Sequence, residues 1–280
     1  MLQGIASKIG SGRKAAPFLF ALLLLFALPA SATEPADLVP RTSVAQGSGG
    51  IAQAWFAEPT SRYAHGALGD SIEAGALAFR LRDGAELRFR LPENRVFEDH
   101  RPRLLSLSGL GDLAMVVESD NRLGARLALY GMAGKSIALQ AHGPFIGTGH
   151  RWLAPIGVGD FDGDGKLNAA LIVTPHLSGI LRVYRLQAGA LPLLAEAAGY
   201  SNHIYGQPEI VLSAVLQRPG GDWIVTPDRE GRRLVALTVE QGKLVEKRSQ
   251  ALPARAMRLQ SRGADIAVDL DGGQRLTLRF

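Results

Sequence analysis

The chain of 280 residues contains no cysteine, so disulfide bonds, zinc–thiolate sites and thiol nucleophiles are all excluded. Charged residues make up only 20% of the sequence, which excludes a long acidic or basic disordered tail. Hydrophobic residues make up 46%, an ordinary value for a globular protein. A domain of this length buries enough apolar surface to be stable without covalent cross-links.

Residues 1–32 have the three parts of a secretory signal peptide. Lys8, Arg13 and Lys14 form a positive region, the apolar run Ala15–Leu28 follows, and Ala30–Ala32 supplies small residues for cleavage. This run is short for a membrane span, which needs about 20 residues. We therefore predict cleavage, export to the periplasm or out of the cell, and a mature chain without a membrane span. An uncleaved anchor is the alternative.

Much of the positive charge of the chain lies in this predicted signal peptide. Removal of residues 1–32 would take away three cations and no anions, and would lower the formal net charge from +5 to +2. The remaining arginines alternate with apolar residues, as in Arg80–Arg82 and Arg88–Arg90, a pattern typical of the solvated face of a sheet. Nucleic-acid binding needs a clustered basic stripe, so we predict no nucleic-acid partner.

The rest of the sequence divides into a leader and one domain. Residues 33–50 are rich in Pro, Ser, Gly and Ala without a period, which predicts a flexible leader. From Ile51 onward, apolar residues alternate over short runs and turn residues recur about every 8–12 positions. This pattern predicts a single all-β domain over residues 51–280.

Three short runs recur in the same order within this domain. They are an apolar strand that begins with Asp or Asn, an alternating strand, and a tight turn followed by a return strand. The turns fall near Asn94, Gly134, Gly189 and Gly242, so their spacings are 40, 55 and 53 residues. Repeats of about 40–50 residues with four strands each are typical of β-propellers, and we predict five blades. The blades begin near Tyr63, Pro102, Trp152, Pro208 and Ala254.

The two ends of the array predict how the ring closes. The fifth unit ends at Phe280 after its third strand, whereas the strand Ile51–Glu58 precedes the first unit without a partner. We predict that this N-terminal strand completes the last blade, because closure removes an exposed sheet edge. An open or sandwich-like stack of sheets is the alternative.

One loop of the third unit has the spacing of a calcium-binding loop. Acidic residues occupy its positions 1, 3 and 5, glycine follows at position 6, and asparagine occupies position 9. The predicted ligands are the side chains of Asp160, Asp162, Asp164 and Asn168 and the backbone carbonyl of Lys166. A flexible loop of oxygen donors favours calcium over magnesium, which demands stricter geometry.

The loop lacks the glutamate that completes a helix-flanked calcium hand, since Leu171 stands at position 12. We therefore expect a dissociation constant on the order of 10⁻⁴ to 10⁻³ M, as in extracellular calcium modules. A plain hairpin turn is the alternative, because Asp and Gly favour turns for local reasons. Three carboxylates within five residues repel one another unless a cation neutralises them, which favours the calcium site.

At this loop the chain resembles the FG-GAP and VCBS repeat family, whose bladed repeats also form the head of integrin α-subunits. The matching stretch runs over residues 156–173 and continues over residues 179–184. The resemblance implies a β-propeller with calcium between the first and second strands of a blade. The equivalent loops of neighbouring units end at Asp112, Asp222 and Asp265 and keep only the last acidic position, so we expect one calcium ion.

Five of the six histidines fall in connections between one predicted unit and the next. They are His65, His100, His142, His150 and His203. Connections of this kind share one face of a propeller, opposite the calcium loop, and convergent polar and aromatic groups there predict a ligand site. Ordinary polar loops are the alternative. No two histidines have the close spacing that is typical of a metal site.

We find no set of residues that predicts catalysis. The acidic candidates Asp70, Glu73, Asp99 and Glu209 do not recur at matching strand positions, and no Gly-x-Ser-x-Gly motif occurs. The family that the loop resembles serves mainly adhesion and ligand recognition, although its repeats also occur in enzymes. We interpret the protein as a non-enzymatic binding or scaffold module with structural calcium and a protein or carbohydrate ligand. An exported hydrolase or lyase that uses the histidine-rich face is the alternative.

Overall fold

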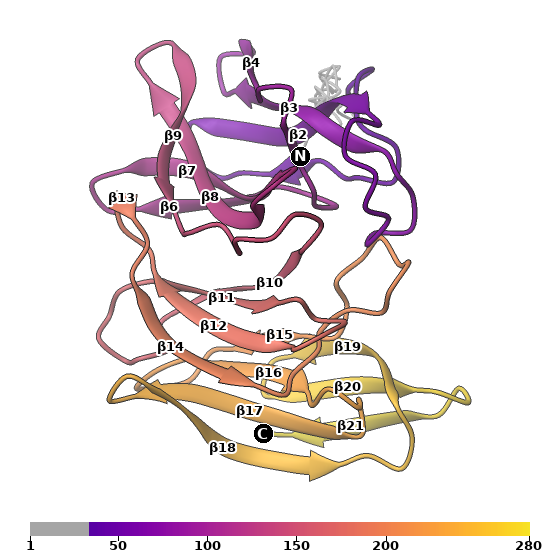
Figure 1. Cartoon of the computed structure of the whole chain (residues 1–280). Coiled ribbons are helices and arrows are strands. Elements are labelled where there is room, and N and C mark those ends of the chain that lie inside the picture. Colours follow the sequence, from indigo (N-terminus) through magenta and orange to yellow (C-terminus); the bar gives the residue numbers. More distant parts are fainter. Residues whose placement is uncertain (1–33) are drawn as a thin grey trace, which may run out of the picture. The chain divides into compact units, whose positions relative to one another are not determined.

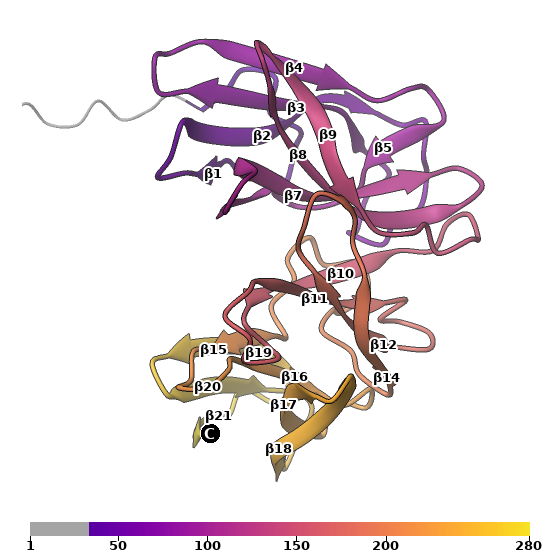
Figure 2. The ribbon, with the colours of Figure 1, turned by 90° about the vertical axis from the view of Figure 1, so that its left-hand side faces the viewer.

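The computed structural model describes residues 34–280, and the predicted signal peptide lies outside them. Every regular element in this range is a β-strand, which confirms the all-β prediction. The strands form four sheets of ten, four, four and three strands, which follow one another in chain order from indigo to yellow except for β13, an orange strand of the first sheet (Figures 1 and 2). Within the described residues, no helix has the length and apolar character needed to cross a membrane.

The first sheet is large and strongly curled. Its strands are β1 (Ala45–Gln46), β2 (Ile51–Thr60), β3 (Glu73–Leu81), β4 (Glu86–Arg90), β5 (Arg95–Phe97), β6 (Arg103–Leu107), β7 (Gly111–Asp120), β8 (Gly124–Ala133), β9 (Ser136–His142) and β13 (Gly189–Ala190). The curl brings Phe56 and Phe79 into one core with Val116 and Tyr130. The sheet therefore encloses a hydrophobic core of its own, as a half-barrel does.

This sheet corrects the prediction for the first two blades. The short strand β5 pairs with β3 through Phe97 and Ala74, and with β7 through Arg95 and Asp120. Because β5 has a partner on both sides, the units that begin near Tyr63 and Pro102 merge into one sheet and are not separate four-stranded blades.

The predicted closure by the N-terminal strand is also wrong. Strand β2 pairs with β3 from Ile51 opposite Leu81 to Thr60 opposite Glu73. Its other edge pairs with β1. Both edges of β2 are occupied, so residues 51–58 do not complete the C-terminal sheet. That sheet has only three strands.

In each of the remaining sheets, antiparallel strands follow one another in chain order. The second sheet contains β10 (Leu153–Gly159), β11 (Asn168–Val173), β12 (Ile180–Arg185) and β14 (Leu193–Ala198). The third contains β15 (Ala214–Leu216), β16 (Trp223–Pro227), β17 (Arg233–Glu240) and β18 (Lys243–Ala251). The fourth contains β19 (Ala256–Arg262), β20 (Asp265–Leu270) and β21 (Arg275–Arg279). Gly242, predicted at a hairpin turn, has φ +74°, a conformation that favours glycine.

Neighbouring sheets share their hydrophobic cores. Leu127 of the first sheet and Leu171 of the second belong to one buried cluster. Ile172 of the second sheet and Leu237 of the third belong to another. A third cluster joins the third and fourth sheets. Alternate residues of the Asn168–Val173 strand enter the first two of these clusters, so this strand is apolar on both faces, as expected for a strand that is covered on both sides.

Residues 34–50 are part of this structure, whereas their composition predicted a flexible leader. Val39 is only 1% exposed, and its N–H donates a hydrogen bond of 3.0 Å to the Phe56 carbonyl. The indole of Trp55 also donates to the carboxylate of Asp37, at 3.1 Å. A few apolar and hydrogen-bonding side chains thus fix a segment in which small residues predominate.

Candidate functional site

The acidic loop connects two paired strands of the second sheet. Strand β10 ends at Gly159 and β11 begins at Asn168, and these two residues lie opposite each other in the sheet. Inside the loop, Gly163 has φ +70°, and a Cβ atom at this position would lie 2.6 Å from the Gly220 carbonyl oxygen. The chain therefore needs glycine here, both for the turn and for the close approach to the β15–β16 connection.

A buried aromatic residue anchors the loop to the third sheet. The Phe161 side chain is fully buried in the core shared by the second and third sheets. Its carbonyl oxygen accepts hydrogen bonds of 2.8 Å from the Val239 N–H and from the Thr238 hydroxyl. The loop thus holds two sheets together, so its conformation matters for their packing.

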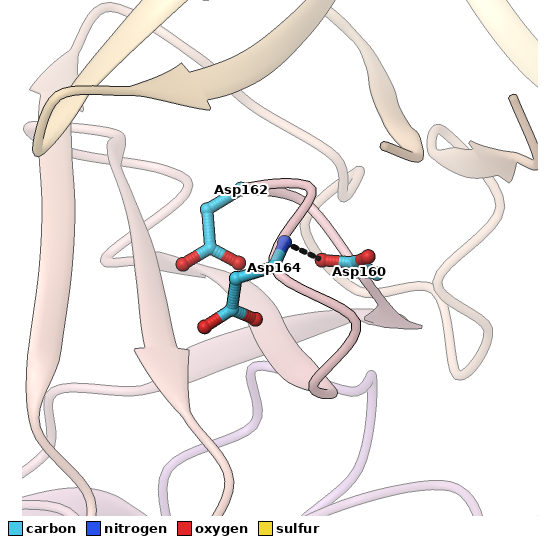
Figure 3. Close-up of side chains that lie close together, drawn as sticks. All are labelled: Asp160, Asp162 and Asp164. Atoms are coloured by element: carbon cyan, nitrogen blue, oxygen red, sulfur yellow. Dashed lines mark hydrogen bonds between the residues drawn. The ribbon is translucent and has the colours of Figure 1, made fainter. Parts of the chain in front are cut away.

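The three aspartates converge as the spacing predicts. One carboxylate oxygen from each of Asp160, Asp162 and Asp164 lies within 4.8 Å of the others. The Asp160 carboxylate accepts hydrogen bonds from the N–H groups of Asp164, at 3.1 Å, and Gly165, at 2.9 Å. Figure 3 shows the three side chains gathered around this turn, with the Asp160–Asp164 hydrogen bond as a dashed line. The backbone therefore folds around its own first carboxylate.

An arginine that the sequence did not single out neutralises part of this charge. The Arg185 guanidinium donates to both oxygens of Asp164, at 2.7 and 2.6 Å, and to Asp162 Oδ2 at 2.6 Å. The hydrogen bond to Asp164 and the charges of both aspartates raise the pKa of Arg185. The same contacts lower the pKa of Asp164. Lys166, whose charge also lowers the pKa of Asp164, lies in the same loop, so three carboxylates and two cations leave a formal charge of −1.

The other two predicted ligands, Asn168 and Lys166, form hydrogen bonds within the loop. Asn168 is fully buried, and its Oδ1 atom accepts a hydrogen bond of 2.8 Å from the Phe161 N–H. The Lys166 N–H donates to Asp164 Oδ1 at 2.9 Å. Both residues therefore help to shape the loop. Asn168 Oδ1 keeps a second lone pair, through which it could also bind a cation.

Asp222, the last acidic position of the next unit, also supports the loop. Its Oδ2 atom accepts a hydrogen bond of 3.0 Å from the Asp160 N–H, and its own N–H donates to the Asp160 carbonyl at 2.7 Å. Asp112 has a related role in the first sheet, where its carboxylate accepts from the Ile51 N–H at 3.3 Å. Asp112 and Asp222 thus each bind the backbone of another segment.

The structure brings several of the predicted connection residues together. His65 packs edge-on against Tyr63 and His150, with ring centroids 6.0 and 5.8 Å apart. His65 Nδ1 lies 2.6 Å from Glu98 Oε1, and Glu98 is fully buried. His142 is not part of this group and faces the Gly143 carbonyl, at 2.9 Å.

A second histidine group includes a residue that the sequence reasoning passed over. His176 Nε2 lies 2.9 Å from His203 Nδ1, and both rings contact Trp152. His176 stands in the connection between β11 and β12, so its position within a unit gave no signal. Within residues 34–280, three or more potential metal-ligating side chains converge only at the aspartate loop.

The chain as a whole matches no protein-family model, and no curated protein matches it.

Proposed function

We propose that the loop Asp160–Asn168 binds one calcium ion and that this ion has a structural role. The main supporting observation is that Asp162 Oδ1 is buried and has no hydrogen-bond partner, in a loop where one oxygen from each of three carboxylates lies within 4.8 Å of the others. An unpaired, buried carboxylate oxygen is unfavourable unless a cation or hydrogen-bond donor reaches it. The ligand atoms are all oxygens, which suits a hard divalent cation, and the residual charge of the loop is negative.

Arg185 supports a structural role for this ion. The guanidinium forms ion pairs with both Asp162 and Asp164, so it helps to hold the loop in the conformation that gathers the carboxylates. A cation added to this loop would stiffen the link that Phe161 and Asp222 make between the second and third sheets. Calcium would therefore stabilise the packing of the sheets and perform no chemistry of its own.

We further propose an exported binding or scaffold module that is a divergent relative of the FG-GAP and VCBS repeats. The support for this relationship is the acidic loop between the first two strands of a four-stranded antiparallel sheet, followed by sheets of similar order. The second, third and fourth sheets correspond to successive blades in this interpretation. The proposed location is the periplasm or the extracellular space, where calcium is abundant enough for a weak site.

The test compares thermal unfolding in excess calcium and in chelator. Calcium should stabilise the wild-type chain by about 1–3 kcal/mol at concentrations well above the expected dissociation constant. The double variant Asp162→Asn/Asp164→Asn should melt at one temperature under both conditions. The matched control Asp271→Asn changes an exposed aspartate in the β20–β21 turn and should keep the calcium response. Identical melting of the wild-type chain with and without calcium would refute the site.

A further inference from the structure

A second polar hollow lies away from the acidic loop, beside the paired histidines. It has a volume of about 300 Å³, and the polar and aromatic side chains that line it are His176, Ser201, His203, Tyr205, Arg229 and Arg255. They come from four separate segments, which lie before β12, after β14, between β16 and β17, and before β19. Polar and aromatic groups that converge from distant segments are typical of ligand sites. We call this hollow the His176 pocket.

The hydrogen bonds fix the proton positions on both imidazoles. His203 Nε2 lies 2.7 Å from the Gln207 carbonyl oxygen, which only accepts, so this nitrogen carries the hydrogen. Burial lowers the pKa of His203 to about 4 and also lowers that of His176, so both rings are neutral at pH 7. His203 Nδ1 therefore accepts from His176 Nε2–H. His176 Nδ1 keeps its lone pair and is available to a ligand hydroxyl.

Two guanidinium groups in the pocket lack acidic partners. Arg229 and Arg255 are exposed, and neither side chain forms an ion pair or hydrogen bond with another described residue. Elsewhere in residues 34–280, many arginines pair with carboxylates, as Arg233 does with Glu246 at 2.8 Å. Two unpaired guanidiniums at one pocket favour an anion, because guanidinium binds a carboxylate through two parallel hydrogen bonds.

Tyr205 adds an exposed aromatic face. This side chain is 64% exposed, and its ring contacts His176 edge-on with centroids 5.2 Å apart. An exposed tyrosine ring beside polar groups offers an apolar surface with a wet edge. The C–H face of a sugar ring is the complementary surface, whereas a small inorganic anion gains nothing from it. The combination therefore favours an acidic sugar over a bare anion.

We propose that the His176 pocket binds a uronate, a sugar that carries a carboxylate. Arg229 and Arg255 hold the carboxylate, the Tyr205 ring covers one face of the sugar, and a sugar hydroxyl donates to His176 Nδ1. This proposal gives a ligand class for the binding module proposed above, and it rests on that proposed function. It shares no residue with the acidic loop, so its failure and the failure of the calcium site are distinguishable.

The test titrates the full chain with D-galacturonate, D-galactose and inorganic phosphate. Trp152 contacts both histidines, with ring centroids 6.2 and 4.8 Å away, so its fluorescence should follow binding, and calorimetry gives the affinity. We expect saturable galacturonate binding that is at least about tenfold tighter than that of galactose, since charge-assisted hydrogen bonds contribute more than a factor of ten. Phosphate should bind more weakly than galacturonate.

The double variant Arg229→Gln/Arg255→Gln should weaken galacturonate binding by about tenfold or more and leave thermal stability unchanged, because both side chains are exposed. The control Arg248→Gln changes an exposed arginine of β18 outside the pocket and should bind as the wild type does. Equal affinity for galactose, equal or tighter binding of phosphate, or undiminished binding by the double variant would each overturn the proposal. Galacturonate binding that persists in chelator, in a chain without any calcium response, would refute only the calcium site.

Discussion

The guanidinium of Arg185 donates a hydrogen bond to each oxygen of the Asp164 carboxylate, at 2.7 and 2.6 Å. Arg185 lies in β12 directly opposite Asn168, the last predicted ligand in the loop. The sheet register therefore delivers a cation to the acidic loop. The Arg185 guanidinium neutralises part of the negative charge of the loop, and the rest remains for a bound cation.

Removal of the guanidinium should make the chain more dependent on calcium. In Arg185→Gln, Asp162 and Asp164 lose their built-in counter-ion and repel each other. We expect the melting temperature in chelator to fall by about 2–4 °C, the value for a loss near 1 kcal/mol in a chain of this size. Calcium should restore most of this loss. A variant that melts like the wild type in chelator would show that the ion pair does not organise the loop.

Asp222 should couple the loop to the third sheet. In Asp222→Ala, the Asp160 N–H loses its acceptor, and we expect a loss of about 1–2 kcal/mol in the free energy of unfolding. Calcium binding should weaken as well, because the start of the loop is less fixed. Urea denaturation measures the first effect. The second carboxylate oxygen of Asp222 accepts from the Arg218 N–H at 3.2 Å, so the alanine variant removes both acceptors. A variant as stable as the wild type would contradict a role for these hydrogen bonds.

Glu73 should destabilise the fold as the pH rises. This residue is 4% exposed, and burial, assisted by the charge of Glu98, raises the pKa of Glu73 to about 10. The folded chain keeps the proton that the unfolded chain releases above its ordinary pKa near 4.5. Stability from this group is therefore complete below pH 4.5 and is lost between about pH 4.5 and 10.

The variant Glu73→Gln has no such proton to lose. Relative to the wild type, it should gain stability with rising pH, by at most about 1.4 kcal/mol per pH unit. Urea denaturation at pH 5, 7 and 9 measures the difference. A difference that stays constant across these pH values would show that Glu73 ionises normally in the folded chain.

His203 should have the opposite pH dependence. Burial lowers its pKa to about 4, so the folded chain keeps it neutral while the unfolded chain takes up a proton below about pH 6.5. Its contribution is complete above pH 6.5 and is lost as the pH falls to about 4, a loss of about 3 kcal/mol. In His203→Gln this acid-dependent loss should disappear. If the free energy of unfolding of the variant falls as steeply below pH 6.5 as that of the wild type, other groups cause the loss.

Local sequence patterns predicted where the strands lie, but they did not predict which distant strands pair with each other. The alternation over residues 87–91 and the apolar run after Asn168 fall on β4 and β11, because side chains of a strand alternate between its two faces. The partners of β2 were predicted wrongly, since any apolar edge suits an apolar strand. The short strand β5, which merges the first two units, has too few residues to give a pattern of its own.

The candidate sites divide in the same way. Asp160, Asp162 and Asp164 are close in sequence, so their spacing sufficed to predict that they converge. Arg185 could have been found only from the register of β11 and β12, which places it opposite Asn168. His176 and His203 are 27 residues apart, and only the folded chain brings their rings together.

The most direct test of the central claim is equilibrium dialysis of the purified chain against calcium. The proposal predicts one bound ion per chain, a dissociation constant on the order of 10⁻⁴ to 10⁻³ M, and weaker binding of magnesium. It also predicts no bound calcium in Asp162→Asn/Asp164→Asn. A wild-type chain that binds no calcium in this range, or a double variant that binds it equally well, would contradict the claim.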